Sequence, residues 1–111
     1  MTALGVRQAK GAADQTNPLL AGGWTVTFTP KDLSIAGDFE VYHIVIRGPG
    51  GQFEVWLDNT FYSAAIRGDR NEYDPNQAMP VRAGQTIYFY WNVATGTAPI
   101  VYLYPRTASP L

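Results

Sequence analysis

The chain contains no cysteine, so its fold uses neither disulfides nor cysteine zinc sites, and thiol catalysis is excluded. Charge is also scarce, since charged residues make up 15% of the 111 residues, well below the roughly 25% of an ordinary soluble domain. The eight Lys and Arg residues are scattered, and the net charge is −1. Nucleic acid is therefore not an expected partner, because phosphate binding needs clustered positive charge.

Long apolar runs are missing as well. No stretch approaches the ~20 apolar residues that a membrane-spanning helix requires, and residues 1–10 lack the apolar core of a secretory signal. We therefore expect no membrane partner and synthesis in the cytoplasm. What the chain does contain is apolar and aromatic residues, at 46% and 14%. A chain of this length forms one domain with one core.

Side-chain alternation predicts an all-β protein. Trp24, Val26 and Phe28 alternate with threonines, as in a strand with one buried face. Turn signals such as Gly48-Pro49-Gly50-Gly51 separate this segment and later ones into seven to eight short strands. The pattern predicts an antiparallel β-sandwich or jelly roll.

The segment 84–92 is unusual because both of its faces carry large side chains. Ile87, Phe89 and Trp91 would point to one face, and Tyr88 and Tyr90 to the other. A tyrosine ring favours cover while its hydroxyl favours a polar partner. The second face is therefore predicted to meet another surface.

Residues 1–22 differ in composition from the rest. Alanine and glycine dominate, and Asn17-Pro18 interrupts the segment. This predicts an extended, flexible N-terminal arm that orders on a partner, followed by a β-sandwich domain over residues 23–111.

No set of residues indicates catalysis. The single histidine, His43, lies within a predicted strand and has no serine partner in a nucleophile motif. Glu54 and Asp58 would lie roughly 13 Å apart along one strand, beyond the ~5–9.5 Å of glycosidase carboxylates. The polar segment 67–77 has calcium-type oxygen ligands without the spacing of an EF-hand, so a hydrogen-bonded turn is favoured. We predict no enzyme activity, no cofactor and no metal.

Aromatic residues on outward strand faces form the main candidate site. Such residues serve as anchors at protein interfaces, and the alternatives are cross-strand packing and stacking against a glycan. Residues 17–20 of the arm are a second predicted contact with a partner. The predicted partner-interface residues are Trp56, Tyr88, Tyr90, Tyr102 and Tyr104, together with Asn17, Pro18, Leu19 and Leu20.

Four segments carry a resemblance to a known class of proteins. They are GPGGQFEVWLDNTFY (48–62), Arg67-Gly68-Asp69, Tyr73-Asp74-Pro75 and GQTIYFYWN (84–92). In these segments the chain resembles small β-sandwich virion proteins of tailed phages of actinobacteria, which act as capsid decoration (cement) or minor structural proteins. The resemblance covers roughly residues 24 to 104 and supplies no catalytic residues.

The resemblance implies a non-enzymatic structural role on the capsid surface of a virion, where the protein would stabilise the shell. Its partners would be the major capsid protein or other virion proteins. Self-association around a lattice axis, most simply as a trimer, would add avidity. The alternative is a carbohydrate-binding module or host-surface adhesin that uses an exposed aromatic face to bind a glycan.

Overall fold

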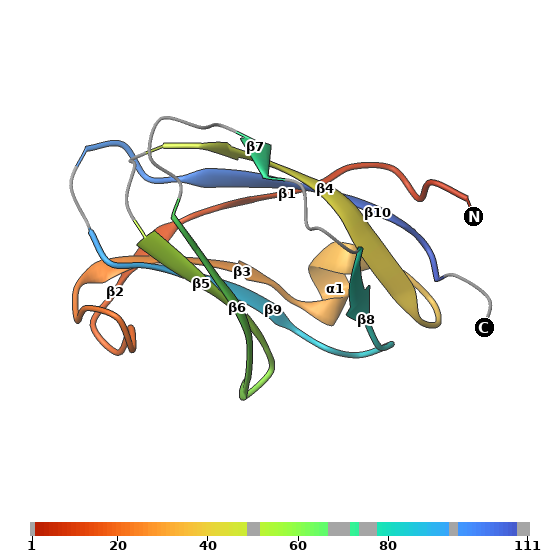
Figure 1. Cartoon of the computed structure of the whole chain (residues 1–111), viewed down its shortest axis with the longest axis horizontal. Helices are drawn as coiled ribbons and strands as arrows, with labels where there is room; N and C mark the ends of the chain where they lie inside the picture. The colour runs from red at the N-terminus through yellow and green to blue at the C-terminus, as the bar shows by residue number, and fades with distance from the viewer. Residues whose placement is uncertain (1, 49–51, 67–71, 74–77, 94–95, 109–111) are drawn as a thin grey trace.

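The computed structural model describes residues 2–48, 52–66, 72–73, 78–93 and 96–108, which form a sandwich of two five-stranded antiparallel sheets (Figure 1). The elements are β1 (Arg7–Lys10), β2 (Ala12–Asp14), β3 (Gly23–Phe28), α1 (Pro30–Leu33), β4 (Phe39–Arg47), β5 (Gln52–Leu57), β6 (Thr60–Ile66), β7 (Glu72–Tyr73), β8 (Met79–Val81), β9 (Ile87–Trp91) and β10 (Ile100–Thr107).

Strand pairing follows the nested pattern of a jelly roll. β5 pairs with β6, β4 with β8, β3 with β9, and β1 with β10, so the chain resembles one long hairpin rolled into two sheets. One sheet has the order β1-β10-β4-β7, with β8 also on β4, and we call it the first sheet. The second sheet has the order β2-β3-β9-β5-β6. The predicted all-β sandwich is confirmed.

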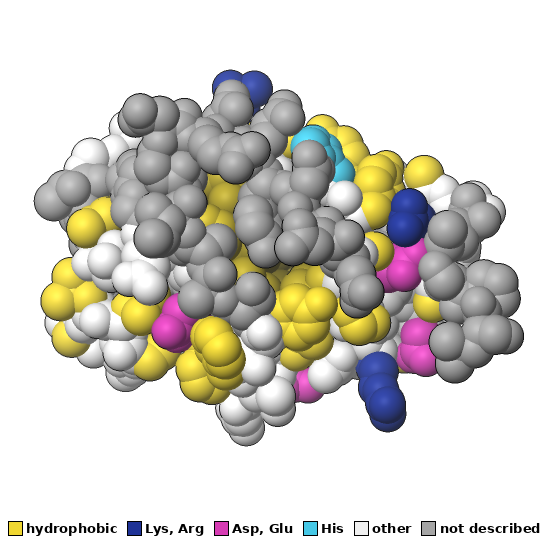
Figure 2. Space-filling model, in the orientation of Figure 1, with side chains coloured by type: hydrophobic (Ala, Val, Ile, Leu, Met, Phe, Trp, Pro, Cys, Tyr) yellow, Lys and Arg dark blue, Asp and Glu magenta, His cyan; other side chains and the backbone are white. Residues whose placement is uncertain are grey.

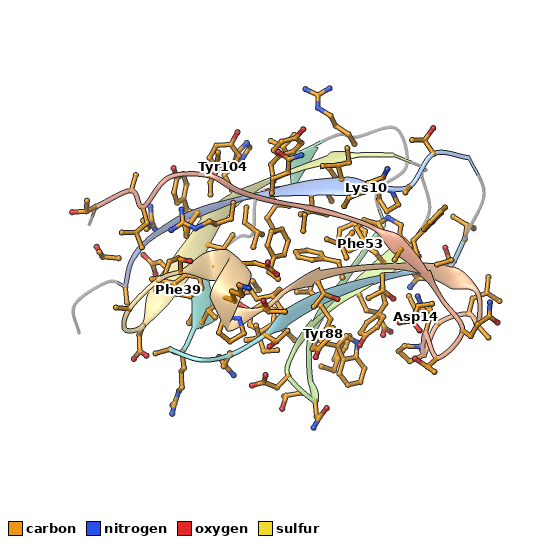
Figure 3. The ribbon with its side chains drawn as sticks, turned by 180° about the vertical axis from the view of Figure 1, so that it is seen from behind. Lys10, Asp14, Phe39, Phe53, Tyr88 and Tyr104 are labelled. Carbon is orange, nitrogen blue, oxygen red and sulfur yellow. The ribbon has the colours of Figure 1, made fainter. Side chains whose placement is uncertain are left out.

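The core lies between the sheets and is built from alternate residues of the long strands. Rings in the second sheet contact one another there: the Phe53 and Trp91 rings stack at 5.0 Å between centroids, and Phe28 meets Phe89 edge-on at 6.2 Å. Figure 3 shows Phe53 between the sheets. The buried hydrophobic residues are Val26, Phe28, Leu33, Phe39, Val41, Ile44, Ile46, Phe53, Val55, Met79, Val81, Ile87, Phe89, Trp91, Val101 and Leu103.

The N-terminal segment departs from the expected flexible arm. Part of it forms strands, since β1 pairs with β10 and β2 pairs with β3, so each sheet gains an edge strand from it. The chain crosses between sheets at Gly11, whose N–H donates to the Pro99 carbonyl. Together with the two-residue β7, these strands raise the number in the described part of the chain to ten, above the seven to eight expected. Strands of two to four residues carry too little alternation to be recognised in a sequence.

A bulge in β4 changes which side chains face the core. Tyr104 lies opposite His43 and Pro105 lies opposite Val41, which leaves Tyr42 as the extra residue. Strict alternation would put Val41 and His43 on the same face; instead Val41 and Ile44 are both buried, while Tyr42 and His43 face outward.

The same bulge explains why β10 runs through Pro105 to Thr107 instead of ending at Pro105 as proline suggests. Proline has no N–H to donate to a sheet, and strands tolerate it at bulges and edges. Pro105 lies beside the register shift, and its carbonyl still accepts from the Leu4 N–H at 2.9 Å.

A single helical turn, α1, follows β3 where no helix was expected. The Thr29 hydroxyl accepts from the Asp32 N–H, and the Asp32 carboxylate accepts from the Thr29 N–H, so the turn has a capping box. Its Leu33 side chain is buried against the core. No helix in the described part of the chain is long and apolar enough to cross a membrane.

We expect Phe89→Ala to lower the free energy of unfolding by about 3–5 kcal/mol, because the ring is fully buried and its loss leaves a cavity. Urea unfolding followed by circular dichroism measures the change. Phe61→Ala is the matched control, since that ring is 49% exposed and should lose less than about 1 kcal/mol. Equal losses of unfolding free energy in the two variants would contradict the burial of Phe89 in the core.

Candidate functional site

The outer face of the second sheet carries two rows of side chains that run across its strands. The strand register places Thr27, Tyr88, Trp56 and Phe61 opposite one another in the first row. The second row contains Thr25, Tyr90 and Glu54. We call the four rings Phe61, Trp56, Tyr90 and Tyr88 the aromatic strip.

The aromatic strip is continuous. Trp56 meets Phe61 edge-on at 5.8 Å and lies at 88° to Tyr90 at 6.2 Å. The Tyr88 and Tyr90 rings, two residues apart on β9, are stacked at 5.7 Å with 6° between their planes. Each ring of the strip therefore packs against at least one other ring.

Glu54 fixes the central ring. Both Glu54 and Trp56 point outward from β5, and the Trp56 indole N–H donates to Glu54 Oε1 at 3.0 Å. The polar end of the indole is thereby satisfied by a carboxylate on the same face. The bond also holds a negative charge next to the aromatic strip.

Asp14 supplies a second carboxylate at the other side of Tyr90. Its Oδ2 accepts from the Thr25 hydroxyl at 2.8 Å, and its Oδ1 accepts from the N–H and hydroxyl of Thr16 at 2.8 and 2.7 Å. Hydrogen bonds from Thr16, and then from Thr25, hold the pKa of Asp14 below its ordinary value. Burial, followed by the neighbouring Tyr88 and Asp14, raises the pKa of Tyr90, which stays a neutral phenol.

Positive charge is absent from the strands beneath this face. None of the residues in β2, β3, β5, β6 and β9 is Lys or Arg, whereas Asp14 and Glu54 are acidic. Figure 2 shows hydrophobic and acidic side chains together over β5 and β6, while the Lys and Arg side chains lie over other parts of the visible surface. The face is therefore both aromatic and acidic.

The five predicted aromatic residues do not share one face. Trp56, Tyr88 and Tyr90 belong to the strip, but Tyr102 and Tyr104 point out from the first sheet. Figure 3 shows Tyr88 and Tyr104 on opposite sides of the sandwich. The division arises because β9 and β10 belong to different sheets.

Tyr104 packs within a separate cluster on the first sheet. Tyr104 lies 5.0 Å from the ring of His43 and 6.2 Å from the ring of Tyr42. The Arg106 guanidinium lies 5.2 Å from the centroid of the Tyr42 ring and donates from Nε to Glu40 Oε1 at 2.8 Å. Arg106 thus contacts both an aromatic ring and a carboxylate of its own chain.

The predicted contact at Asn17–Leu20 is a loop organised by a buried side chain. Asn17 Nδ2 donates to the carbonyls of Trp24 and Trp91, both at 3.0 Å. Asn17 Oδ1 accepts from the N–H groups of Leu19 and Leu20 at 2.8 and 3.3 Å. Asn17 therefore has a structural role, while Pro18 and Leu20 are exposed and Leu19 is half-buried.

Phe61 and Asp14 belong to this face but were not among the predicted site residues. Phe61 faces outward beside Trp56 because a register shift between Val55 and Trp56 leaves Tyr62 as the extra residue in β6. Asp14 is brought to Thr25 by the docking of β2. The aromatic residues that follow the Asp58-Asn59 turn were the only sequence signal for Phe61, and the sequence carried none for Asp14.

Side chains that could ligate a metal do not gather in the described residues. These residues contain no group of three or more His, Asp or Glu side chains that could hold a metal ion. Most of the polar segment 67–77 and the turn residues 49–51 lie outside the described residues, as do Arg67-Gly68-Asp69 and Asp74-Pro75 of the resemblance. The chain matches no protein-family model, no curated protein and no solved structure.

We expect Asn17→Ala to destabilise the protein by about 1–3 kcal/mol, because the buried carbonyl of Trp91 loses a donor and two loop N–H groups lose their acceptor. Denaturant unfolding measures the loss. Asn59→Ala, the same change at an exposed turn position, should stay within about 0.5 kcal/mol. A neutral Asn17→Ala would show that the loop does not depend on this amide.

Asp14 should make stability fall in acid. Its pKa is lower in the folded protein than in the unfolded chain, so its contribution is complete above the unfolded value and is lost as pH falls below about 4. The thermal midpoint of the wild type should therefore drop more steeply between about pH 6 and pH 3 than that of Asp14→Asn. Asp32, whose pKa its Thr29 bonds also lower, remains in both proteins. If the thermal midpoints of the wild type and Asp14→Asn fell in parallel as the pH is lowered, Asp14 would not be a source of the acid sensitivity.

Proposed function

We propose that the chain is a non-enzymatic virion structural protein, a capsid decoration protein whose second sheet binds a protein surface of the shell. The observation that carries the binding role is the aromatic strip, a continuous set of four rings on an outer sheet face. Trp and Tyr are enriched among residues that dominate protein interfaces. Phe61 is 49% exposed, so burial against a partner would remove apolar surface from water.

Ring orientation favours a protein partner over a glycan. A sugar stacks best on an open ring face, but Tyr88 and Tyr90 direct faces toward each other in a stacked pair. Trp56 stands perpendicular to Tyr90, so the Trp56 ring does not continue the parallel pair of tyrosine rings as a flat surface. Ring edges, hydroxyls and a half-exposed Phe61 are instead suited to the irregular surface of a protein.

The virion assignment has separate support. It comes from the resemblance of residues 24–104 to small phage virion proteins, and the jelly-roll topology is compatible with it because jelly rolls occur in viral capsid domains. Lectin domains share this fold, so the topology alone does not select the partner. Decoration requires a compact body with an ordered outer surface, and the mutually packed rings of the aromatic strip support that role.

We expect the purified protein to co-sediment with shells of actinobacterial tailed phages that have been stripped of accessory proteins. Trp56→Ala should weaken this binding by about 30-fold or more, the effect of removing a central aromatic anchor. Tyr102→Ala is the matched control, because Tyr102 points outward from the opposite sheet, and it should bind as the wild type does.

Three results would contradict the proposal. The first is failure of the protein to bind any shell, and the second is an equal loss of binding in Trp56→Ala and Tyr102→Ala. The third is quenching of tryptophan fluorescence by soluble polysaccharide in the wild type and not in Trp56→Ala, which would replace the proposal with a glycan-binding module.

A further inference from the structure

We infer that the aromatic strip, with Asp14 and Glu54, binds an arginine-bearing segment of a partner protein. The inference rests on the proposed function for the identity of that partner, the shell, and it adds the chemistry of the contact. It is carried by the charge of the face, by the unused acceptors of two carboxylates, and by the Arg106 arrangement on the opposite face.

The two carboxylates lie on either side of Tyr90. Thr25 and Glu54 are both opposite Tyr90 in the strand register, and Thr25 donates to Asp14. Neighbouring strands are about 4.8 Å apart, so Thr25 and Glu54 are separated by roughly 10 Å with a ring between them. A cation above Tyr90 would lie between two negative charges, and the five strands of this sheet supply no Lys or Arg to compete with it.

Both carboxylates retain capacity to accept hydrogen bonds. An ionised carboxylate has about four acceptor positions. Asp14 uses three for the Thr16 N–H and the hydroxyls of Thr16 and Thr25, and Glu54 accepts one bond from the Trp56 indole. The internal bonds therefore orient the carboxylates and leave positions for a donor from outside.

Arginine suits this face better than lysine. Its planar guanidinium has five N–H donors and can bond to a carboxylate through two parallel bonds, while lysine presents a compact charge. The guanidinium plane and its aliphatic stem can also pack on an exposed ring such as Phe61.

The opposite face already shows this combination within the chain. Arg106 lies over the Tyr42 ring and pairs with the Glu40 carboxylate. Glu54 beside Trp56 and Tyr90 repeats the ring and carboxylate elements on the second sheet, whose own strands contain no arginine. The partner is therefore expected to provide a guanidinium group, as Arg106 does on the first sheet.

The test titrates the full-length ¹⁵N-labelled protein with a synthetic peptide of alternating arginine and glycine and follows the indole N–H signal of Trp56. We expect a saturable shift with this peptide, a weaker effect with the matching lysine peptide, and none with the glutamate peptide. Glu54→Gln and Asp14→Asn should each weaken binding about three- to five-fold, the effect of an exposed charge pair.

Asp38→Asn is the control, since it makes the same change of charge outside the strands of the second sheet. Thermal unfolding of each variant checks that the fold is retained. If Asp14→Asn does not fold, the inference is tested with Glu54→Gln alone. Equal binding of the arginine and glutamate peptides would overturn the inference. So would arginine binding that Glu54→Gln leaves unchanged.

Salt dependence of shell binding separates the inference from the proposed function. Both hold if shell binding requires Trp56, weakens as salt rises and weakens in Glu54→Gln. If shell binding requires Trp56 but is insensitive to salt and to Glu54→Gln, the inference fails while the proposed function stands. If the arginine peptide binds at Trp56 and no shell does, the inference holds and the proposed function fails.

Discussion

The pairing of β9 with β3 on one side and β5 on the other is the constraint on which the rest of the second sheet depends. It fixes the register that buries Ile87, Phe89 and Trp91 against the first sheet. Because side chains alternate along a strand, the same pairing directs Tyr88 and Tyr90 to the outer face. Burial of the core therefore also positions the aromatic strip, and one cannot shift without the other.

Hydrogen bonds from two polar side chains join neighbouring segments to this sheet. Asn17 joins its loop to the ends of β3 and β9, and Thr25 joins β2 to the outer face through Asp14. Both residues belong to contacts made by the first 25 residues of the chain. The N-terminal segment is thus a structural part of the sandwich as well as the source of one acidic group beside Tyr90.

Charge differs between the two faces in a way that matches the proposed role. The strands of the first sheet contain Arg7, Lys10, Arg47 and Arg106, whereas those of the second contain only acidic charges. On the first sheet Arg106 is already engaged by Glu40 and Tyr42. On the second sheet rigid rings lie beside carboxylates with spare acceptor positions. Complementary charge at such a face would favour correct orientation on a partner and speed the encounter.

The sequence by itself determined the all-β class, most strand positions and the outward direction of Trp56, Tyr88 and Tyr90. These follow from local alternation and turn residues, which a single segment records. Only the tertiary structure decided that Tyr102 and Tyr104 lie on the opposite face, that Phe61 joins the strip with Asp14 on the same face, and that residues 7–14 complete both sheets. Sheet membership, bulges at Tyr42 and Tyr62, and edge pairing depend on contacts between distant segments, and local patterns do not encode those contacts.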